Sequence, residues 1–276
     1  MTLVQHIYTK YLQTNMNKIY LLGDIHGRDF WKELKENTED LIIFVGDYVD
    51  PYTYYENITK EQALENFKEI IEFARTNKNV VLLVGNHDCT YFLNELVCAC
   101  RTDYENFDEI QKLFRDNADL FRLAYYLEYN GEKILITHAG VHVSWFEYEQ
   151  INEDPTIQSI CNHPKEICDY LNTKFKELQE KDYPRRDKFI SALAEVSGYR
   201  GGWSNYGSCI WADVHEWEGV EVFGDPCLDC YQIFGHTQLE KGYPLIGKHF
   251  ACIDSKEVYT LDYILDKRDE NIRINA

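Results

Sequence analysis

The chain has 276 residues, of which 45% are hydrophobic and 27% are charged. This composition is ordinary for a globular protein, and the length allows one large domain or two small ones. Acidic residues outnumber basic ones 47 to 28, for a net charge of −19. Nucleic-acid enzymes gather Lys and Arg, so nucleic acid is excluded as a stable partner.

The N-terminal segment and the cysteines bear on where the protein resides. Residues 1–17 lack the apolar core and cleavage site of a secretory signal, and we interpret them as an N-terminal extension. No apolar stretch approaches the ~20 residues of a membrane helix, so no membrane partner is expected. Nine dispersed cysteines predict reduced thiols and a cytoplasmic location. Cys227 and Cys230 form one CxxC pair. Because a structural zinc site needs four ligands and this pair supplies two, we interpret both residues as free thiols.

From residue 18 the chain alternates predicted strands and helices. The apolar runs KIYLL (18–22), LIIFV (41–45) and VVLLV (80–84) predict buried strands. The segment 61–77 is predicted to be a helix because its apolar residues recur at helical spacing, and 91–100 and 107–123 are also expected to be helical. Strands separated by helices indicate a parallel sheet with right-handed crossovers.

A different pattern begins after the strand KILIT at 133–137. Residues 141–200 contain two amphipathic stretches, 166–181 and 185–198, and form a predicted helical insertion. This insertion is either a lid over the site or a packing layer on a second core face. From 201 onward, YGSCIWAD, GVEVFG, YQIFG, KHFACID and EVYTLDYIL predict mainly antiparallel strands. We expect a second sheet packed on the first, within a single domain over 1–276.

Short polar clusters follow five of the predicted strands. The clusters are GDIHG (23–27), GDYVD (46–50), GNHD (85–88), THAG (137–140) and GHT (235–237). In open α/β sheets, ligands bind beyond the carboxyl ends of the strands, so these clusters are expected to meet at one edge. Their oxygen and nitrogen donors, without thiolate, predict a site for two divalent or trivalent metal ions, with manganese favoured and iron or zinc as alternatives. The predicted ligands are Asp24, His26, Asp47, Asn86, His138 and His236.

In order and spacing, these clusters resemble those of the calcineurin-like metallophosphoesterases. The similarity is to the branch with the phosphoprotein phosphatases and the bacterial diadenosine tetraphosphate hydrolases, and it covers about 18–140 and 205–262. It implies an α/β fold, a four-layer α/β/β/α double-sheet sandwich. It assigns one metal to Asp24, His26 and Asp47, and a second to Asp47 with Asn86, His138 and His236.

The resemblance also implies a mechanism. A hydroxide that bridges the two metals would attack phosphorus in line, so no protein nucleophile is required. His87 matches the family's general acid, and Asp50 matches the carboxylate that orients it. Many phosphodiesterase members carry a second histidine two positions after the last one. Gln238 stands at that position here, as in the phosphatase-like branch.

One departure from the family pattern concerns the substrate phosphate. Phosphoprotein phosphatases continue the second cluster with Asp-Arg-Gly, whereas this chain reads Asp50-Pro51-Tyr52. The bidentate guanidinium fork of that arginine is therefore missing. Arg200, followed by two glycines, and Arg28 are candidate replacements, and Tyr52 is a candidate to stack on the substrate.

Three functions follow from these observations. The leading one is phosphomonoester hydrolysis of the serine/threonine protein phosphatase kind, with a phosphorylated protein or a small phosphoester as substrate. The second is a phosphoanhydride or phosphodiester hydrolase that acts on dinucleoside polyphosphates or nucleotides. The third is a catalytically silent metal-binding module, which the intact Asn86-His87 pair disfavours. The oligomeric state is open.

Overall fold

The computed structural model describes residues 18–37, 39–93, 99–146, 160, 163–180, 188–217 and 229–275. The expected extension 1–17, Cys227 and the run GVEVFG at 219–224 lie outside these residues.

The first sheet has five strands in the order β10-β1-β2-β3-β4. Its strands are β1 (Ile19–Leu22), β2 (Leu41–Phe44), β3 (Val80–Leu83), β4 (Phe121–Arg122) and β10 (Val258–Thr260). β1 to β4 run parallel, as the alternation of strands and helices predicts, and β10 pairs antiparallel with β1. The carboxyl ends of β1, β2 and β3 therefore lie at one edge.

The second sheet has five strands in the order β5-β6-β7-β9-β8. Its strands are β5 (Ala124–Tyr129), β6 (Glu132–Thr137), β7 (Tyr231–Phe234), β8 (Leu245–Ile246) and β9 (Phe250–Cys252). Asn130 and Gly131, with φ of 52° and 86°, form the tight turn between β5 and β6; positive φ at both positions suits a two-residue hairpin. β6, β7 and β9 are mutually parallel, so their carboxyl ends also share an edge.

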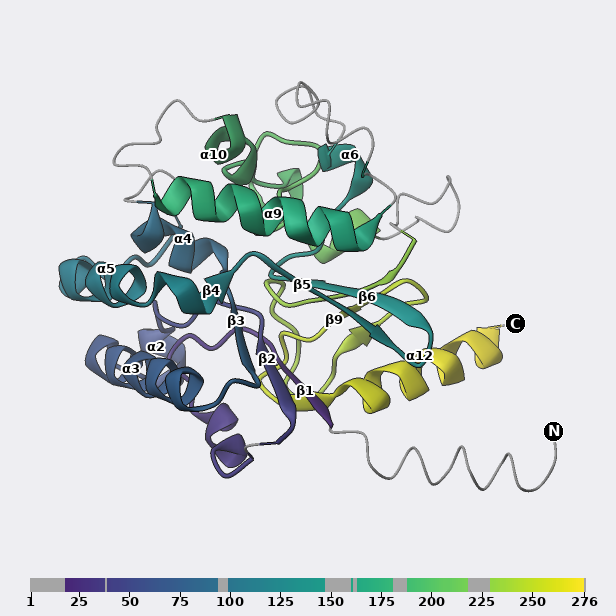
Figure 1. Ribbon diagram of the computed structural model, residues 1–276, viewed down its shortest axis with the longest axis horizontal. Helices are drawn as coiled ribbons and strands as arrows, with labels where there is room; N and C mark the ends of the chain where they lie inside the picture. The colour runs from purple at the N-terminus through teal and green to yellow at the C-terminus, as the bar shows by residue number, and fades with distance from the viewer. Residues whose placement is uncertain are drawn as a thin grey trace.

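Helices flank both sheets (Figure 1). The α-helices are α2 (Thr53–Glu56), α3 (Lys60–Thr76), α4 (Asn86–Phe92), α5 (Phe107–Asp116), α6 (Val143–Phe146), α9 (Pro164–Gln179), α10 (Lys188–Leu193) and α12 (Leu261–Asn275). Short 3-10 helices are η1 (Phe30–Leu34), η2 (Ala118–Leu120), η3 (Gly198–Arg200) and η4 (Val214–Trp217). α3 is capped by Thr59, whose hydroxyl and backbone exchange hydrogen bonds with Gln62 in a capping box.

Burial on both faces of the strands defines the layers. Alternate residues of β2 point to opposite sides: Ile43 packs in the core with Ile134 of the second sheet, whereas Phe44 packs in the core with Phe67 of α3. On the outer face of the second sheet, α9 packs against β5 and β6. The order is therefore helix, sheet, sheet, helix, and the expected α/β/β/α double-sheet sandwich is confirmed.

Several predicted elements differ from the observed ones. The run YGSCIWAD is not a strand, because Trp211 and Ala212 donate backbone hydrogen bonds to Ser208 and close a turn. β7 is parallel to both of its neighbours, not antiparallel. In EVYTLDYIL only Val258–Thr260 is a strand. The Thr260 hydroxyl accepts a hydrogen bond from the backbone of Tyr263, and α12 begins at Leu261.

One predicted helix is shorter than expected: the helix expected over 107–123 ends at Asp116, before the strand β4. Of the helix expected over 91–100, the first two residues belong to α4, and residues 94–98 lie outside the described part of the chain. The helix predicted at 61–77 is α3 almost to the residue.

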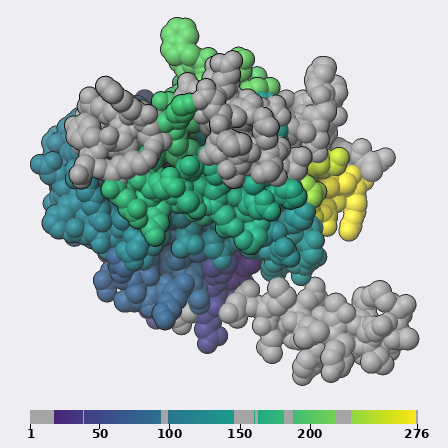
Figure 2. Space-filling view, turned by 45° about the horizontal axis from the view of Figure 1, so that its top comes forward, coloured from purple at the N-terminus to yellow at the C-terminus, as the bar shows by residue number. Residues whose placement is uncertain are grey.

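The described part of the insertion 141–200 is dominated by α9. Its buried residues include Ile167, Leu171 and Phe175, and the Phe175 ring lies 5.3 Å from that of Phe92 on α4. In Figure 2 the green surface of α9 spreads across the middle of the face in view. α9 therefore acts as a packing layer, and a lid role for the rest of the insertion stays a prediction. No helix among the described residues is long and apolar enough to cross a membrane.

Candidate metal centre

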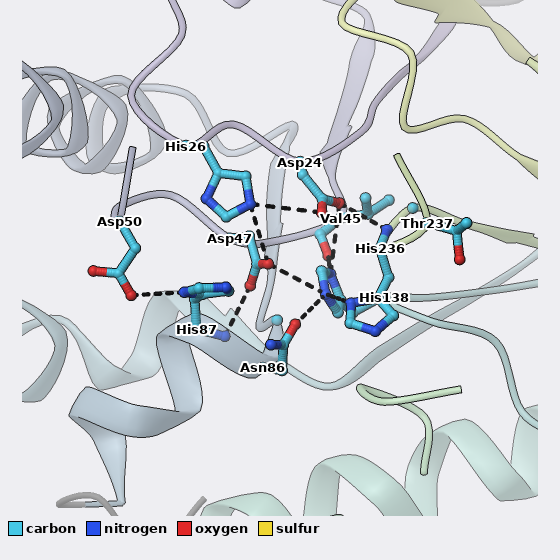
Figure 3. Close-up of polar contacts among 12 residues, drawn as sticks. Asp24, His26, Val45, Asp47, Asp50, Asn86, His87, His138, His236 and Thr237 are labelled. Carbon is cyan, nitrogen blue, oxygen red and sulfur yellow. Dashed lines mark hydrogen bonds and ion pairs between the residues drawn. The ribbon is translucent and has the colours of Figure 1, made fainter. Parts of the chain in front are cut away.

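The five polar clusters meet where the two sheets present their carboxyl ends. Asp24, Asp47 and Asn86 follow β1, β2 and β3 of the first sheet, and His138 and His236 follow β6 and β7 of the second. Figure 3 shows these side chains pointing toward one another. All of them are at least 95% buried. The site therefore depends on both sheets, and all six predicted ligands come together, because His26 also faces Asp47.

Backbone turns at the strand ends aim these side chains inward. His26, Asp47, Asp50 and His236 have φ of 44°, 56°, 58° and 66°, which is the left-handed region. Non-glycine residues adopt it at a cost of about 1–3 kcal/mol and concentrate at functional sites. Backbone hydrogen bonds hold the turns, for example from His26 N to the Asp47 carbonyl at 2.6 Å.

Two glycines leave room for the carboxylates. A Cβ at Gly85 would lie 2.0 Å from Oδ1 of Asp47, and a Cβ at Gly235 would lie 2.5 Å from Oδ1 of Asp24. Each glycine thus creates space that a carboxylate fills, so any side chain at position 85 or 235 would displace a predicted ligand.

Hydrogen bonds to backbone carbonyls orient two of the histidines. Nδ1 of His26 donates to the Val49 carbonyl at 2.9 Å, and Nδ1 of His138 donates to the Val45 carbonyl at 2.8 Å. The Nε2 atoms are left with lone pairs that face the centre, the usual arrangement of a metal-binding imidazole. Nε2 of His138 lies 3.0 Å from Oδ1 of Asn86 and 3.1 Å from Nδ1 of His236.

Asp47 lies in the middle of the cluster. Its Oδ2 is 3.5 Å from Nε2 of His26 on one side and 3.6 Å from Nε2 of His138 on the other. Oδ2 of Asp24 lies 3.9 Å from Nε2 of His26. Asp47 is therefore the carboxylate that can bridge two cations.

The donor set fits metal ions. Among the described residues, two groups have ligand atoms within 4.8 Å of one another, namely Asp24, Asp47, His138 and His236, and His26, Asp47 and His87. Nε2 of His236 is buried and has no hydrogen-bond partner in the described part of the chain. Burial raises the pKa of Asp47 well above its usual value and lowers the pKa of His26 and His236 well below theirs. Cations would offset the cost of keeping this carboxylate ionised and would use the neutral imidazole lone pairs.

His87 and Asp50 form a pair at the edge of this cluster. Nδ1 of His87 lies 2.7 Å from Oδ2 of Asp50, whose Oδ1 accepts hydrogen bonds from the Tyr91 hydroxyl and the Asp103 backbone. Burial raises the pKa of Asp50 to about 7. Burial, followed by the nearby charge of Arg101, lowers the pKa of His87 well below its usual value. The imidazole is thus held in one orientation by Asp50.

Two further acids support the site and were not predicted. Both oxygens of the buried Asp88 accept backbone hydrogen bonds, from Asp47 and Tyr48 across the site and from Gly85 in its own cluster. Asp254 follows β9, and its Oδ1 is buried without a hydrogen-bond partner among the described residues. Burial, followed by the Asp24 charge, raises the pKa of Asp254 well above its usual value. The sequence does carry a signal for Asp254, because this aspartate ends the apolar run KHFACID just as the predicted ligands follow other apolar runs.

The predicted substrate binders have different surroundings. The Arg28 guanidinium makes two hydrogen bonds to Glu56, at 2.6 and 3.0 Å, and a third to the Asp24 carbonyl, which favours a role in supporting Asp24. Arg200 donates to Asp213 at 2.9 Å and to the His236 carbonyl at 3.4 Å, beside the cluster. The Tyr52 ring lies edge-on to His26, with centroids 5.1 Å apart.

Comparison with known proteins gives three findings. A family profile described as calcineurin-like phosphoesterase matches residues 17–239. No curated protein matches. Among solved structures, one match is a protein serine/threonine phosphatase from Saccharomyces cerevisiae with similarity to human phosphatase PP5. The sequences are 14% identical, the match covers 90% of this chain and 74% of that one, and the TM-score is 0.44.

Proposed function

Because this chain belongs to the calcineurin-like phosphoesterase family, it is a metal-dependent phosphoester hydrolase, and we propose that its substrates are phosphomonoesters. The observation that carries the proposal is the His87–Asp50 pair. The 2.7 Å contact with Asp50 orients the imidazole of His87, which directly follows the predicted ligand Asn86 in the chain. An acid that protonates a leaving alkoxide needs this position next to the metals.

The proposed ligands divide between two metal ions. Asp24, His26 and Asp47 would hold the first, and Asp47, Asn86, His138 and His236 the second. When bound, two such cations lower the pKa of coordinated water and stabilise charge on phosphoryl oxygens. Manganese is the proposed occupant, with iron or zinc as alternatives, because the ligands are imidazole nitrogen and oxygen without sulfur.

The chain's own groups would then position the ester and move one proton. Nε2 of His87 would donate its proton to the leaving oxygen, while Asp50 holds Nδ1 and keeps the ring fixed. Arg200 lies next to His236 and is a candidate to contact a phosphate oxygen. No group of the protein needs to become covalently attached to phosphorus.

Position 238 supports a monoester over a diester substrate. A second histidine there would add a ligand to the first metal in phosphodiesterase-like members. The chain has Gln238, which is exposed to solvent. We therefore propose an enzyme of the serine/threonine protein phosphatase kind, acting on a phosphorylated protein or a small phosphomonoester.

A second candidate function is hydrolysis of dinucleoside polyphosphates. Tyr54 and Tyr55 follow the Asp50 cluster and are 89% and 83% exposed. Exposed aromatic rings can stack on a nucleotide base. This observation keeps a phosphoanhydride substrate as the alternative.

A substrate comparison tests the proposal. The purified protein, loaded with Mn²⁺, is assayed with p-nitrophenyl phosphate, bis(p-nitrophenyl) phosphate and diadenosine tetraphosphate, and bound metal is measured on the same samples. We expect the monoester to be hydrolysed fastest and EDTA to abolish turnover. Faster cleavage of the tetraphosphate would favour the second candidate. Bound metal without turnover of any substrate would indicate a silent metal-binding module.

A cytoplasmic location is also proposed. Nine dispersed cysteines support it, and the described ones, such as Cys89 and Cys209, are free thiols.

A further inference from the structure

Arg101 lies beside Asp50, the residue that phosphoprotein phosphatases follow with an arginine. Position 51 is proline, so the second cluster supplies no guanidinium. Arg101 comes from the loop after α4, 51 residues further along the chain, and its Nε lies 3.5 Å from the Asp50 carbonyl. We propose that Arg101 binds the substrate phosphate in place of the missing arginine, an inference that rests on the proposed phosphoesterase function.

Contacts with Tyr52 and His87 also hold the Arg101 guanidinium at the His87–Asp50 pair. Its central carbon lies 3.8 Å from the centroid of the Tyr52 ring, which is stacking distance for a cation on an aromatic face. Its Nη2 lies 3.4 Å from Nε2 of His87. The Tyr52 ring therefore stacks against the guanidinium, and the proposed role of Tyr52 is to position Arg101.

Among the described residues, the charge of Arg101 has no carboxylate in an ion pair with it. Arg28 pairs with Glu56 and Arg200 pairs with Asp213. In the part of the chain that the structure describes, no ion pair joins Arg101 to an acidic side chain, and Arg101 is exposed to solvent. A guanidinium at the edge of the metal cluster with a free charge can receive an anionic substrate.

The backbone around Arg101 is fixed to the same pair. Arg101 has φ of 64°, in the left-handed region. Two residues later, the Asp103 backbone donates to Oδ1 of Asp50 at 3.1 Å and to the Tyr91 hydroxyl at 2.8 Å. Asp50 thus anchors the loop that carries Arg101 as well as the ring of His87. This strained, anchored turn is the kind of geometry found where a side chain is held for function.

The geometry points to a terminal phosphate as the group that is bound. The planar fork of an arginine donates two parallel hydrogen bonds and needs two free oxygens on one phosphate. A monoester dianion has three non-bridging oxygens, so two can accept from the guanidinium while the third faces the metals. A phosphate oxygen in this position would replace His87 as the partner of Nη2, which leaves Nε2 of His87 facing the leaving group.

The test uses Mn²⁺-loaded protein and five variants: Arg101→Ala, Arg101→Lys, Tyr52→Ala, Tyr52→Phe and, as a charge-matched control, Arg115→Ala on the exposed side of α5. The Michaelis constant for p-nitrophenyl phosphate and the inhibition constant of inorganic phosphate are measured. Phosphate binding is also followed by calorimetry, which does not depend on turnover, and metal content and circular dichroism are recorded.

Arg101→Ala is expected to raise both constants about 10- to 100-fold, the worth of a hydrogen-bonded charge. Lysine should recover only part, because it lacks the fork. Tyr52→Ala is expected to weaken phosphate binding, and phenylalanine at that position to recover most of the loss by keeping the ring. The loss for bis(p-nitrophenyl) phosphate should be smaller than for the monoester. Arg115→Ala should bind phosphate like the wild type.

The outcomes separate the two proposals. If the wild-type protein turns over no phosphoester, the proposed function fails. If the wild type is active but Arg101→Ala leaves the Michaelis constant and the phosphate affinity unchanged, the assignment of Arg101 is wrong and the proposed function stands. Loss of bound metal in Arg101→Ala would also overturn the assignment, because Arg101 would then support the metal site.

Discussion

At the scale of single residues, His87 is the side chain whose role is easiest to separate from metal binding. His87→Ala is expected to lower kcat about 10²- to 10⁴-fold, the usual contribution of a general acid, with metal content unchanged. The loss should be larger with phenyl phosphate than with p-nitrophenyl phosphate, because nitrophenolate leaves readily without a proton. Kinetics with both esters and metal analysis check this.

A loss of metal from His87→Ala would contradict this role. His87 shares a possible metal-binding group with His26 and Asp47, so that outcome would make it a ligand. An equal loss for the two esters would show that His87 does not protonate the leaving group.

The raised pKa of Asp50 predicts that the stability of the protein depends on pH. Burial raises its pKa from 3.8 to about 7, so between these values the folded protein holds a proton that the unfolded chain releases. This contribution to stability is complete below the unfolded value and is lost as the pH rises through about 7. Asp50→Asn has no such proton. In the metal-free protein, we expect the wild type to lose stability relative to Asp50→Asn as the pH rises.

Thermal melts of both proteins across this pH range check the prediction. Asparagine cannot ionise, so the pH dependence of the difference between the two proteins reports on Asp50 and on the His87 ring that contacts it. A difference in melting temperature that stays constant with pH would show that Asp50 is ionised throughout.

The sequence predicted the residues at strand ends better than those in loops. Asp47 and His138 come within three residues of the ends of apolar strands, and parallel strands bring such positions to one edge. Arg101 could not be found in this way, because its loop position carries no periodicity and depends on contacts with Tyr52. Arg28 was predicted to bind the substrate because it follows the first cluster in the sequence. Its pairing with Glu56, 28 residues away, has no signal in the sequence.

At the scale of elements, α9 connects the packing of the second sheet to the site. Phe175 on α9 is buried and contacts Phe92, at the end of the helix that begins with Asn86. Phe175→Ala is expected to destabilise the protein by about 3–5 kcal/mol, through lost burial and the cavity left behind. Urea denaturation measures it, and Lys176→Ala, an exposed neighbour on α9, is the control. A similar effect of both variants would mean that α9 does not pack as described.

The elements that were predicted well are those with strong local patterns. α3 has apolar residues at helical spacing and a capping box, so its limits could be read from the sequence. YGSCIWAD has the composition of a strand but folds as a turn around Ser208, whose hydroxyl donates to the Leu193 carbonyl. This contact joins the turn to the end of α10, and the strand propensity of the residues in YGSCIWAD does not reveal such a tertiary contact.

At the scale of the whole molecule, the metal site joins the two sheets. Asp24, Asp47 and Asn86 follow strands of the first sheet and His138 and His236 follow strands of the second, so ions bound by the proposed ligands would stabilise the contact between the sheets. At Mn²⁺ concentrations ~100 times the dissociation constant, binding adds about 2.7 kcal/mol. We expect a rise in melting temperature of roughly 5–10 °C.

Scanning calorimetry of metal-free and Mn²⁺-loaded protein measures this rise. Asp47→Asn, which weakens the proposed bridge, should reduce it strongly. An equal rise in that variant would place the stabilising ion elsewhere on the acidic surface.

The left-handed turns at His26, Asp47, Asp50 and His236 have a consequence for how the enzyme acquires its ions. These turns are held by hydrogen bonds within the protein, so the proposed ligands lie in position without an ion. Loading would then require little movement of the chain. One ion would be able to replace another without a large rearrangement of the site. Which metal the enzyme carries would follow the supply of ions around it as much as the ligands themselves.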